Sequence, residues 1–208
     1  MRHASLFNIH FIMSVNLIDS IQANLHYPPL QKIDPNTQEV VVDNTKPDEH
    51  RFSQAAIPAI LTGLYEYVKT DAGAENVLRG DISTNWVNTI FDNTKDEVTQ
   101  KIASYSFLPV EGSLERMNDI ANEAIRLIRE NIKPRGTMMD VKTFMADQRN
   151  TILLYLPEAL HMGELLKDTT LDDNTNKMEG PVSTLMHKIG SAFSKPPNEE
   201  KLHSNNNQ

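Results

Sequence analysis

Apolar residues recur every three or four positions along most of this chain, which is the spacing of amphipathic helices. The first predicted helix is capped by Ser14 and ends before Pro28, because proline cannot continue it. The second runs from Glu49 or Ser53 to Lys69. Its apolar face is as wide as a buried helix requires and comprises Phe52, Ala56, Ile57, Ile60, Leu61, Leu64 and Val68.

Cap and stop residues place three further helices in the middle of the chain. Asp71 can cap a short helix, which Gly80 then ends. The apolar residues around Trp86 mark the next helix. Thr94 and Glu97 have the spacing of a capping box, and they predict the start of the third.

The clearest amphipathic pattern covers Ser113–Ile132 and predicts one long helix. Thr137 and Asp140 predict a second capping arrangement, at the start of the helix that follows. Pro157 is suited to the first turn of a last core helix ending near Leu166. The whole pattern predicts an all-α fold, a multihelical bundle of about seven helices.

Composition divides the chain into three parts. We expect Met13 to be the natural start, so that residues 1–13 are a start-site extension or disordered. Residues 14–168 form the predicted helical domain. Residues 169–208 begin as a polar linker, carry a short amphipathic segment at 182–193 and end in a tail that we expect to be disordered.

Charge and composition exclude several classes of function. The net charge of −8 disfavours a nucleic-acid interface, which needs clustered Lys and Arg, and loose adsorption to anionic membranes. The absence of cysteine excludes disulfides, thiol nucleophiles and thiolate metal sites. No apolar run approaches the roughly 18 residues of a membrane span. We expect a cytoplasmic protein.

Two apolar segments that each contain a proline carry a family resemblance. The first is Ala55–Leu78, in which Pro58 should either kink the helix or begin its regular part, and the second is Asp147–Leu160. Together they resemble the signature of the YidB-like bacterial family, a helical domain of unknown function. Ala56–Leu64 match the first part of that signature and Thr70–Ala74 match the turn that follows.

The resemblance spans most of the chain, from about Leu17 to Leu166, but its middle departs from the family pattern. Thr94–Ile132 is charged and poor in glycine, where the family often has glycine-rich segments. The resemblance implies a multihelical fold. It brings no established catalytic residues to this chain.

Glu158 and His161 form the one spacing that points to metal chemistry. On a continuous helix, Glu-x-x-His places both side chains on one face, and Glu164 would extend that face. A di-iron bundle also needs a second Glu-x-x-His and two further inward glutamates, which we do not find. We therefore expect a solvated face here, with no metal and no cofactor.

Several other residues have a structural and a functional interpretation. Met138, Met139 and Met145 can form an adaptable binding surface, but the tendency of methionine to be buried favours core packing. Arg149 is expected to pair with Asp147 or with another acid.

The segment 182–193 is the candidate for binding a partner. We favour the interpretation that it folds back onto the bundle, because so short a helix is marginal alone. The functional alternative is docking on a protein or on an anionic membrane surface. Its apolar stripe consists of Val182, Leu185, Met186, Ile189 and Phe193.

No nucleophile elbow, phosphate loop or dinucleotide fingerprint is present. We expect a non-enzymatic interaction or scaffold protein that binds an unknown protein partner or a second copy, and no nucleic acid. The alternative is peripheral membrane association through 182–193. A weaker rival is a metal-dependent helical-bundle enzyme that uses Glu158 and His161.

Overall fold

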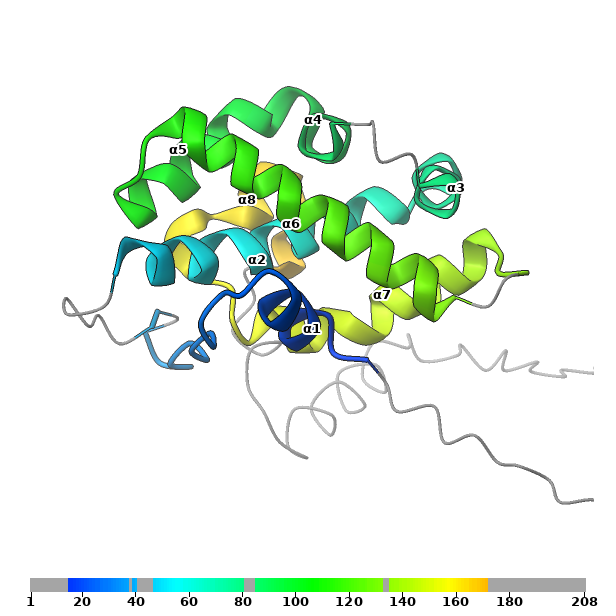
Figure 1. Cartoon of the computed structure of the whole chain (residues 1–208), viewed down its shortest axis with the longest axis horizontal. Helices are drawn as coiled ribbons and strands as arrows, with labels where there is room; N and C mark the ends of the chain where they lie inside the picture. The colour runs from blue at the N-terminus through cyan, green and yellow to red at the C-terminus, as the bar shows by residue number, and fades with distance from the viewer. Residues whose placement is uncertain (1–14, 38, 41–46, 81–84, 133–134, 172–208) are drawn as a thin grey trace, which may run out of the picture. The chain divides into compact units, whose positions relative to one another are not determined.

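A computed structural model describes residues 15–37, 39–40, 47–80, 85–132 and 135–171. Within these ranges the chain forms α-helices and short 3-10 turns and no strand, so the predicted all-α multihelical bundle is confirmed (Figure 1). The α-helices are α1 (Leu17–Asn24), α2 (Asp48–Val68), α3 (Asp71–Arg79), α4 (Trp86–Phe91), α5 (Lys95–Ser106), α6 (Val110–Asn131), α7 (Met138–Leu153) and α8 (Met162–Leu166). The 3-10 turns are η1 (Asp92–Thr94), η2 (Glu158–Leu160) and η3 (Thr169–Leu171).

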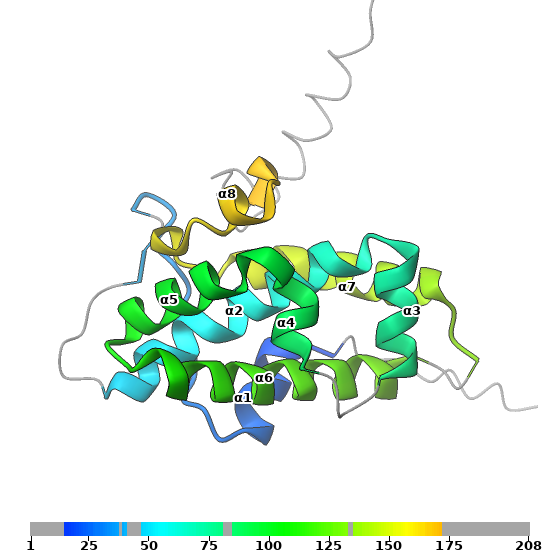
Figure 2. The ribbon, with the colours of Figure 1, turned by 90° about the horizontal axis from the view of Figure 1, so that it is seen from above.

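Helix α2 is the centre of the bundle. Each of the other α-helices in the described residues contacts it, and Figure 2 shows it running between its neighbours. From Phe52 to Leu64 every residue of α2 is buried, on all sides of the helix. The apolar face identified in the sequence therefore covers only part of the buried surface of α2, since the polar residues Ser53, Gln54 and Thr62 are buried as well.

Pro58 lies in the interior of α2, because the helix begins at Asp48. It does not begin the regular part of the helix, which was one of the two expectations. Proline has no N–H to donate to the carbonyl of residue 54. Pro58 is buried among the other helices, so the apolar surface of its ring contributes to the packing of α2.

The predicted helix caps are confirmed at two positions. Thr137 accepts from the main-chain N–H of Asp140, and the Asp140 carboxylate accepts from the N–H of Thr137 at 2.7 Å, which completes a capping box at the start of α7. Gly80 has φ +53° and ends α3 in the left-handed conformation that glycine adopts without strain.

Three other predicted caps differ from the structure. Asn16 caps α1, whereas Ser14 lies outside the described residues. Thr70 caps α3, and Asp71 is the first residue of that helix. The capping box at Thr94 is wrong: η1 leads directly into α5, so Thr94 is already helical and its hydroxyl donates to the carbonyl of Phe91 at 2.7 Å.

The packed domain reaches beyond the boundary expected at residue 168. Leu171 in η3 is completely buried and belongs to the same apolar core as α2 and α7. The predicted tail from residue 172 onward and the start-site extension 1–13 lie outside the described residues. Both stay predictions.

Candidate functional site

Glu158 and His161 do not lie on one helical face, so the geometry expected for a metal pair is wrong. Glu158 begins the 3-10 turn η2, and His161 has φ +48°, a left-handed conformation that separates η2 from α8. The break follows from Pro157, which is extended and precedes a single tight turn instead of the first turn of an α-helix. In the described part of the chain, no three His, Asp or Glu side chains are grouped closely enough to hold a metal ion.

The predicted partner-binding residues Val182, Leu185, Met186, Ile189 and Phe193 lie outside the described residues. Their role stays a prediction.

The three methionines divide between core and surface. Met145 is completely buried, as core packing predicts. That prediction is wrong for Met138 and Met139, which are 38% and 67% exposed at the start of α7. They lie on the first turn of the helix, before its buried residues begin.

Phe107 is an exposed aromatic residue in an unusual main-chain conformation. It ends α5 with φ +58°, and the residue is 74% exposed. Its N–H donates to the carbonyl of Ser104, and the N–H of Leu108 donates to that of Ala103. This pair of hydrogen bonds commonly closes a helix, but the residue in the left-handed position is usually glycine. Val110, 42% exposed, follows at the start of α6.

An arginine from α2 stacks on the Phe107 ring. The guanidinium carbon of Arg51 lies 4.9 Å from the ring centroid, within cation–π range, and Arg51 also pairs with Asp48. We call Arg51, Phe107 and Val110 the Phe107 surface.

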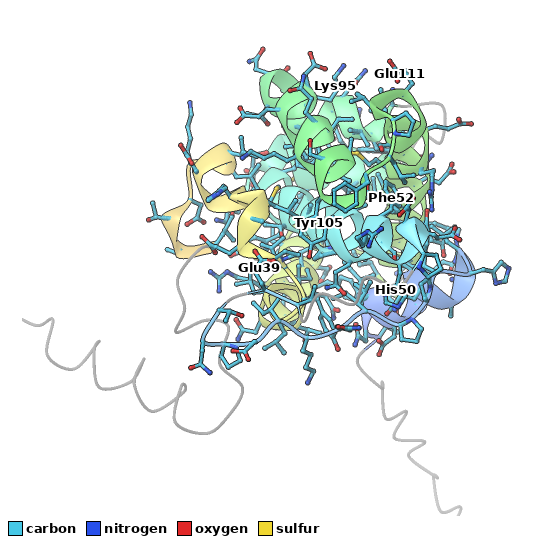
Figure 3. The ribbon with its side chains drawn as sticks, turned by 90° about the vertical axis from the view of Figure 1, so that its left-hand side faces the viewer. Glu39, His50, Phe52, Lys95, Tyr105 and Glu111 are labelled. Carbon is cyan, nitrogen blue, oxygen red and sulfur yellow. The ribbon has the colours of Figure 1, made fainter. Side chains whose placement is uncertain are left out.

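A second stack lies nearby on α2. Arg116 of α6 lies 4.2 Å from the centroid of the buried Phe52 ring and pairs with Glu49 at 3.1 Å. Figure 3 looks onto this end of the bundle, where Phe52 of α2 and Glu111 of α6 are labelled. Arg116 therefore connects the start of α2 to α6, and Arg51 connects it to Phe107, at the turn between α5 and α6.

An open groove of about 510 Å³ lies between α5 and η2. It is lined by Glu97, Gln100, Lys101, Ser104, Tyr105 and Ala159. Burial, together with the negative charge of Glu39, raises the pKa of Tyr105 to about 12. The Tyr105 hydroxyl therefore stays protonated at neutral pH, where it can donate a hydrogen bond but cannot act as a base.

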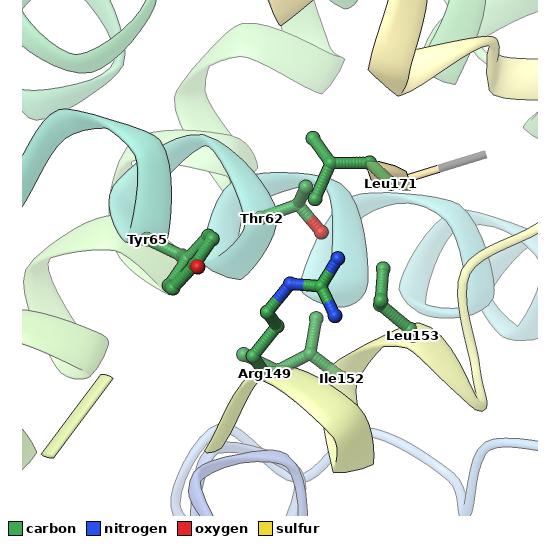
Figure 4. Close-up of a pocket in the computed structure, with 6 residues that line it drawn as sticks. All are labelled: Thr62, Tyr65, Arg149, Ile152, Leu153 and Leu171. Atoms are coloured by element: carbon green, nitrogen blue, oxygen red, sulfur yellow. The ribbon is translucent and has the colours of Figure 1, made fainter. Parts of the chain in front are cut away.

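A narrow crevice between α2, α7 and η3 brings together residues that are far apart in the sequence (Figure 4). Its space of about 150 Å³ is too narrow to admit water. It is lined by Thr62, Tyr65, Arg149, Ile152, Leu153 and Leu171.

Arg149 in this crevice does not pair with an acid in the way the sequence predicted. Its Nη2 donates to the main-chain carbonyl of Thr170 at 2.9 Å and to the Thr170 hydroxyl at 3.1 Å. Its guanidinium carbon lies 5.8 Å from the ring centroid of Tyr65. The side chain therefore holds η3 against α2 and α7.

A charged cluster at the end of α2 holds the same turn. Lys69 Nζ lies 2.6 Å from a carboxylate oxygen of Glu66 and 2.7 Å from one of Asp168. Burial raises the pKa of Glu66. Burial acts in the same direction on Asp168, but hydrogen bonds from Lys69 and Thr170 outweigh it and hold the pKa of Asp168 well below its usual range.

Sequence reasoning missed both Phe107 and the crevice, although each has a signal in the sequence. Leu171 is the one apolar residue in the polar run 167–177. A leucine in such a run indicates that this part of the chain packs on the core and is not a solvated linker. Phe107 has a weaker signal: it stands at a helix end where glycine is usual.

No helix in the described ranges is long and apolar enough to cross a membrane. Comparison of the chain with known protein families, curated proteins and solved structures gives no match.

Proposed function

We propose that this chain is a non-enzymatic helical interaction domain that binds a protein partner through the Phe107 surface. The observation that carries the proposal is the exposed Phe107 ring on a left-handed main chain. That conformation costs an L-residue about 1–2 kcal/mol, which glycine would avoid. Residues that break local rules in this way are found preferentially at functional sites.

The acidic residues at the starts of α2 and α6 indicate the chemistry of the partner. Asp48, Glu49 and Glu111 are exposed at the starts of α2 and α6. Arg51 and Arg116 are already paired with two of these acids, and the chain as a whole carries a net charge of −8. The complementary partner is a protein segment with an apolar side chain between Lys or Arg residues.

The resemblance to YidB-like proteins agrees with this proposal but adds no site to it. It rests on Ala56–Leu64 and Thr70–Ala74, which lie in α2 and in the turn into α3. We propose the same family relationship for the chain. A multihelical domain without established catalytic residues is suited to an interaction or scaffold role.

The test compares three full-length baits in affinity capture from native lysate: wild type, Phe107→Gly and Met139→Ala. Met139→Ala is the matched control, because it also removes an exposed apolar side chain, from α7. We expect a protein that binds wild type and the control and is lost with Phe107→Gly. With that protein purified, Phe107→Gly should weaken the Kd by about tenfold or more. Identical partners for all three baits would overturn the proposal.

The same design tests the predicted amphipathic segment 182–193. A bait with Leu185→Asp and Ile189→Asp should keep the Phe107-dependent partner. If it loses that partner, the segment is the docking element. Flotation of wild type and of this double variant with anionic liposomes tests the alternative of membrane association. That alternative requires wild type to float with the liposomes and the double variant not to float.

A further inference from the structure

The turn η3 packs against α2 and α7 in the manner of a bound peptide and forms one wall of the crevice between them. Three contacts hold it: the completely buried Leu171 side chain against the core of α2 and α7, the Asp168 carboxylate on Lys69, and the Thr170 carbonyl on Arg149. We call the place of the Leu171 side chain on α2 and α7 the slot. Figure 4 shows Leu171 across from Arg149 and Leu153. An apolar anchor, a charge pair and a main-chain hydrogen bond are the usual elements of peptide recognition.

The groups that hold the turn belong to the bundle. Thr62 and Tyr65 come from α2 and Lys69 directly follows its last residue, while Arg149 and Leu153 come from α7. Helices α2 and α7 contact one another extensively, independently of η3. The contact between α2 and α7 therefore keeps the residues of the slot in place when η3 is not bound, which a peptide-binding site requires.

The hydrogen bonds of the turn define a compact recognition pattern. The second carboxylate oxygen of Asp168 accepts from the main-chain N–H of Thr170 at 3.0 Å and from its hydroxyl at 2.7 Å. The N–H of Leu171 donates to the carbonyl of Asp168 at 3.1 Å. This tight turn lets the Asp168 carboxylate bind Lys69 while the Leu171 side chain is buried in the slot. The pattern that the slot recognises is therefore an acid three residues before a leucine.

The attachment of the turn is local and partly exposed to solvent. It follows Lys167, a non-glycine residue with φ +57°, and the short helix α8. The Lys69 side chain is 43% exposed, so water competes for its bond to Asp168. A short turn held in this way opens more readily than the helices beneath it.

We propose that the α2–α7 slot is a peptide-binding site which η3 occupies in cis. Its ligand in trans is a protein segment with a carboxylate three residues before a leucine, the chemistry of Asp168 and Leu171. The site is separate from the Phe107 surface and does not depend on it. A tethered occupant is present at a high effective concentration, so the intact chain binds such a segment only weakly.

The test uses a fluorescently labelled synthetic peptide of residues 166–173 and full-length proteins. Leu171→Ala empties the apolar slot, and Leu166→Ala is the matched control with the same chemical change in α8. Fluorescence anisotropy should show at least about tenfold tighter binding to Leu171→Ala than to wild type or the control, the factor expected for one buried leucine. A peptide with alanine at the leucine position should not bind.

Further variants connect the signal to the slot. Arg149→Ala added to Leu171→Ala should abolish peptide binding, because the contact to the main-chain carbonyl is lost. If circular dichroism shows that Leu171→Ala is unfolded, Asp168→Asn replaces it: this variant keeps the leucine, loosens the turn and should bind the peptide more tightly than wild type. Equal binding by wild type and the folded variant, or no binding by either, overturns the proposal.

Discussion

Gly63 of α2 and Phe91 of α4 are in such close contact that no side chain fits between them. A Cβ on Gly63 would lie 2.3 Å from Cε1 of Phe91, far inside the van der Waals distance. A glycine in the interior of a buried helix is therefore explained by the aromatic ring that packs across it.

Gly63→Ala should destabilise the protein by about 1–3 kcal/mol, the usual cost of an overpacked core, despite the better helix propensity of alanine. Gly112→Ala is the matched control, because a Cβ on Gly112 of α6 meets nothing within 4 Å. It should be neutral or stabilise by up to about 1 kcal/mol. Urea denaturation of both variants measures the change in the free energy of unfolding. A higher stability of Gly63→Ala than of wild type would contradict the close contact of Gly63 with Phe91.

Phe107→Gly should be more stable than Phe107→Ala by about 1 kcal/mol. Both variants lose the ring and its stack on Arg51. They differ in the left-handed main chain, which alanine strains and glycine does not. Thermal unfolding measures the difference directly. If the alanine variant were the more stable one, residue 107 would not be left-handed in solution.

Asp168→Asn should lower stability at neutral pH by about 1 kcal/mol, since Lys69 loses one of its two acidic partners and is partly exposed. The folded-state pKa of Asp168 is lowered, so its contribution is present above the unfolded pKa and is lost as the pH falls through the folded pKa. The gap in Tm between wild type and Asp168→Asn should therefore narrow in strong acid. A gap that stays constant with pH would mean that the charge of Asp168 is not involved.

Tyr105 should ionise well above the usual pH range of a tyrosine. Its folded-state pKa is raised from 10.0 to about 12, so its contribution to stability is intact below pH 10 and is lost as the pH rises toward 12. Ultraviolet titration of tyrosinate should show a late component that Tyr105→Phe removes. Tyr105→Phe should also unfold less readily in alkali than wild type. A late component that survives Tyr105→Phe would assign the shift to another tyrosine.

The sequence predicted the helices well because their stability depends mainly on apolar periodicity. The long stripe of Ser113–Ile132 corresponds to α6, whose observed bounds are Val110–Asn131. Signals that depend on a single turn were less reliable. The same type of capping pattern succeeded at Thr137 and failed at Thr94, because Thr94 is the last residue of the 3-10 turn η1 and is already in a helical conformation.

The candidate sites were harder to predict because they depend on the path of the chain between helices. Glu158 and His161 share a face only if the helix is continuous, and His161 interrupts it with a left-handed residue. The contact of Arg149 with Thr170 joins two segments whose meeting is decided by the packing of η3 on α2 and α7. Local spacing carries no information about either arrangement.

Helix α2 also fixes how far apart the two proposed binding sites lie. Arg51 of the Phe107 surface is in its first turns, whereas Tyr65 and Lys69 of the η3 slot are at its end. At 1.5 Å of rise per residue, the positions of Arg51 and Lys69 are separated by about 27 Å along the helix axis. A short segment can therefore occupy each site without covering the other, and the buried helix between the sites keeps their spacing constant.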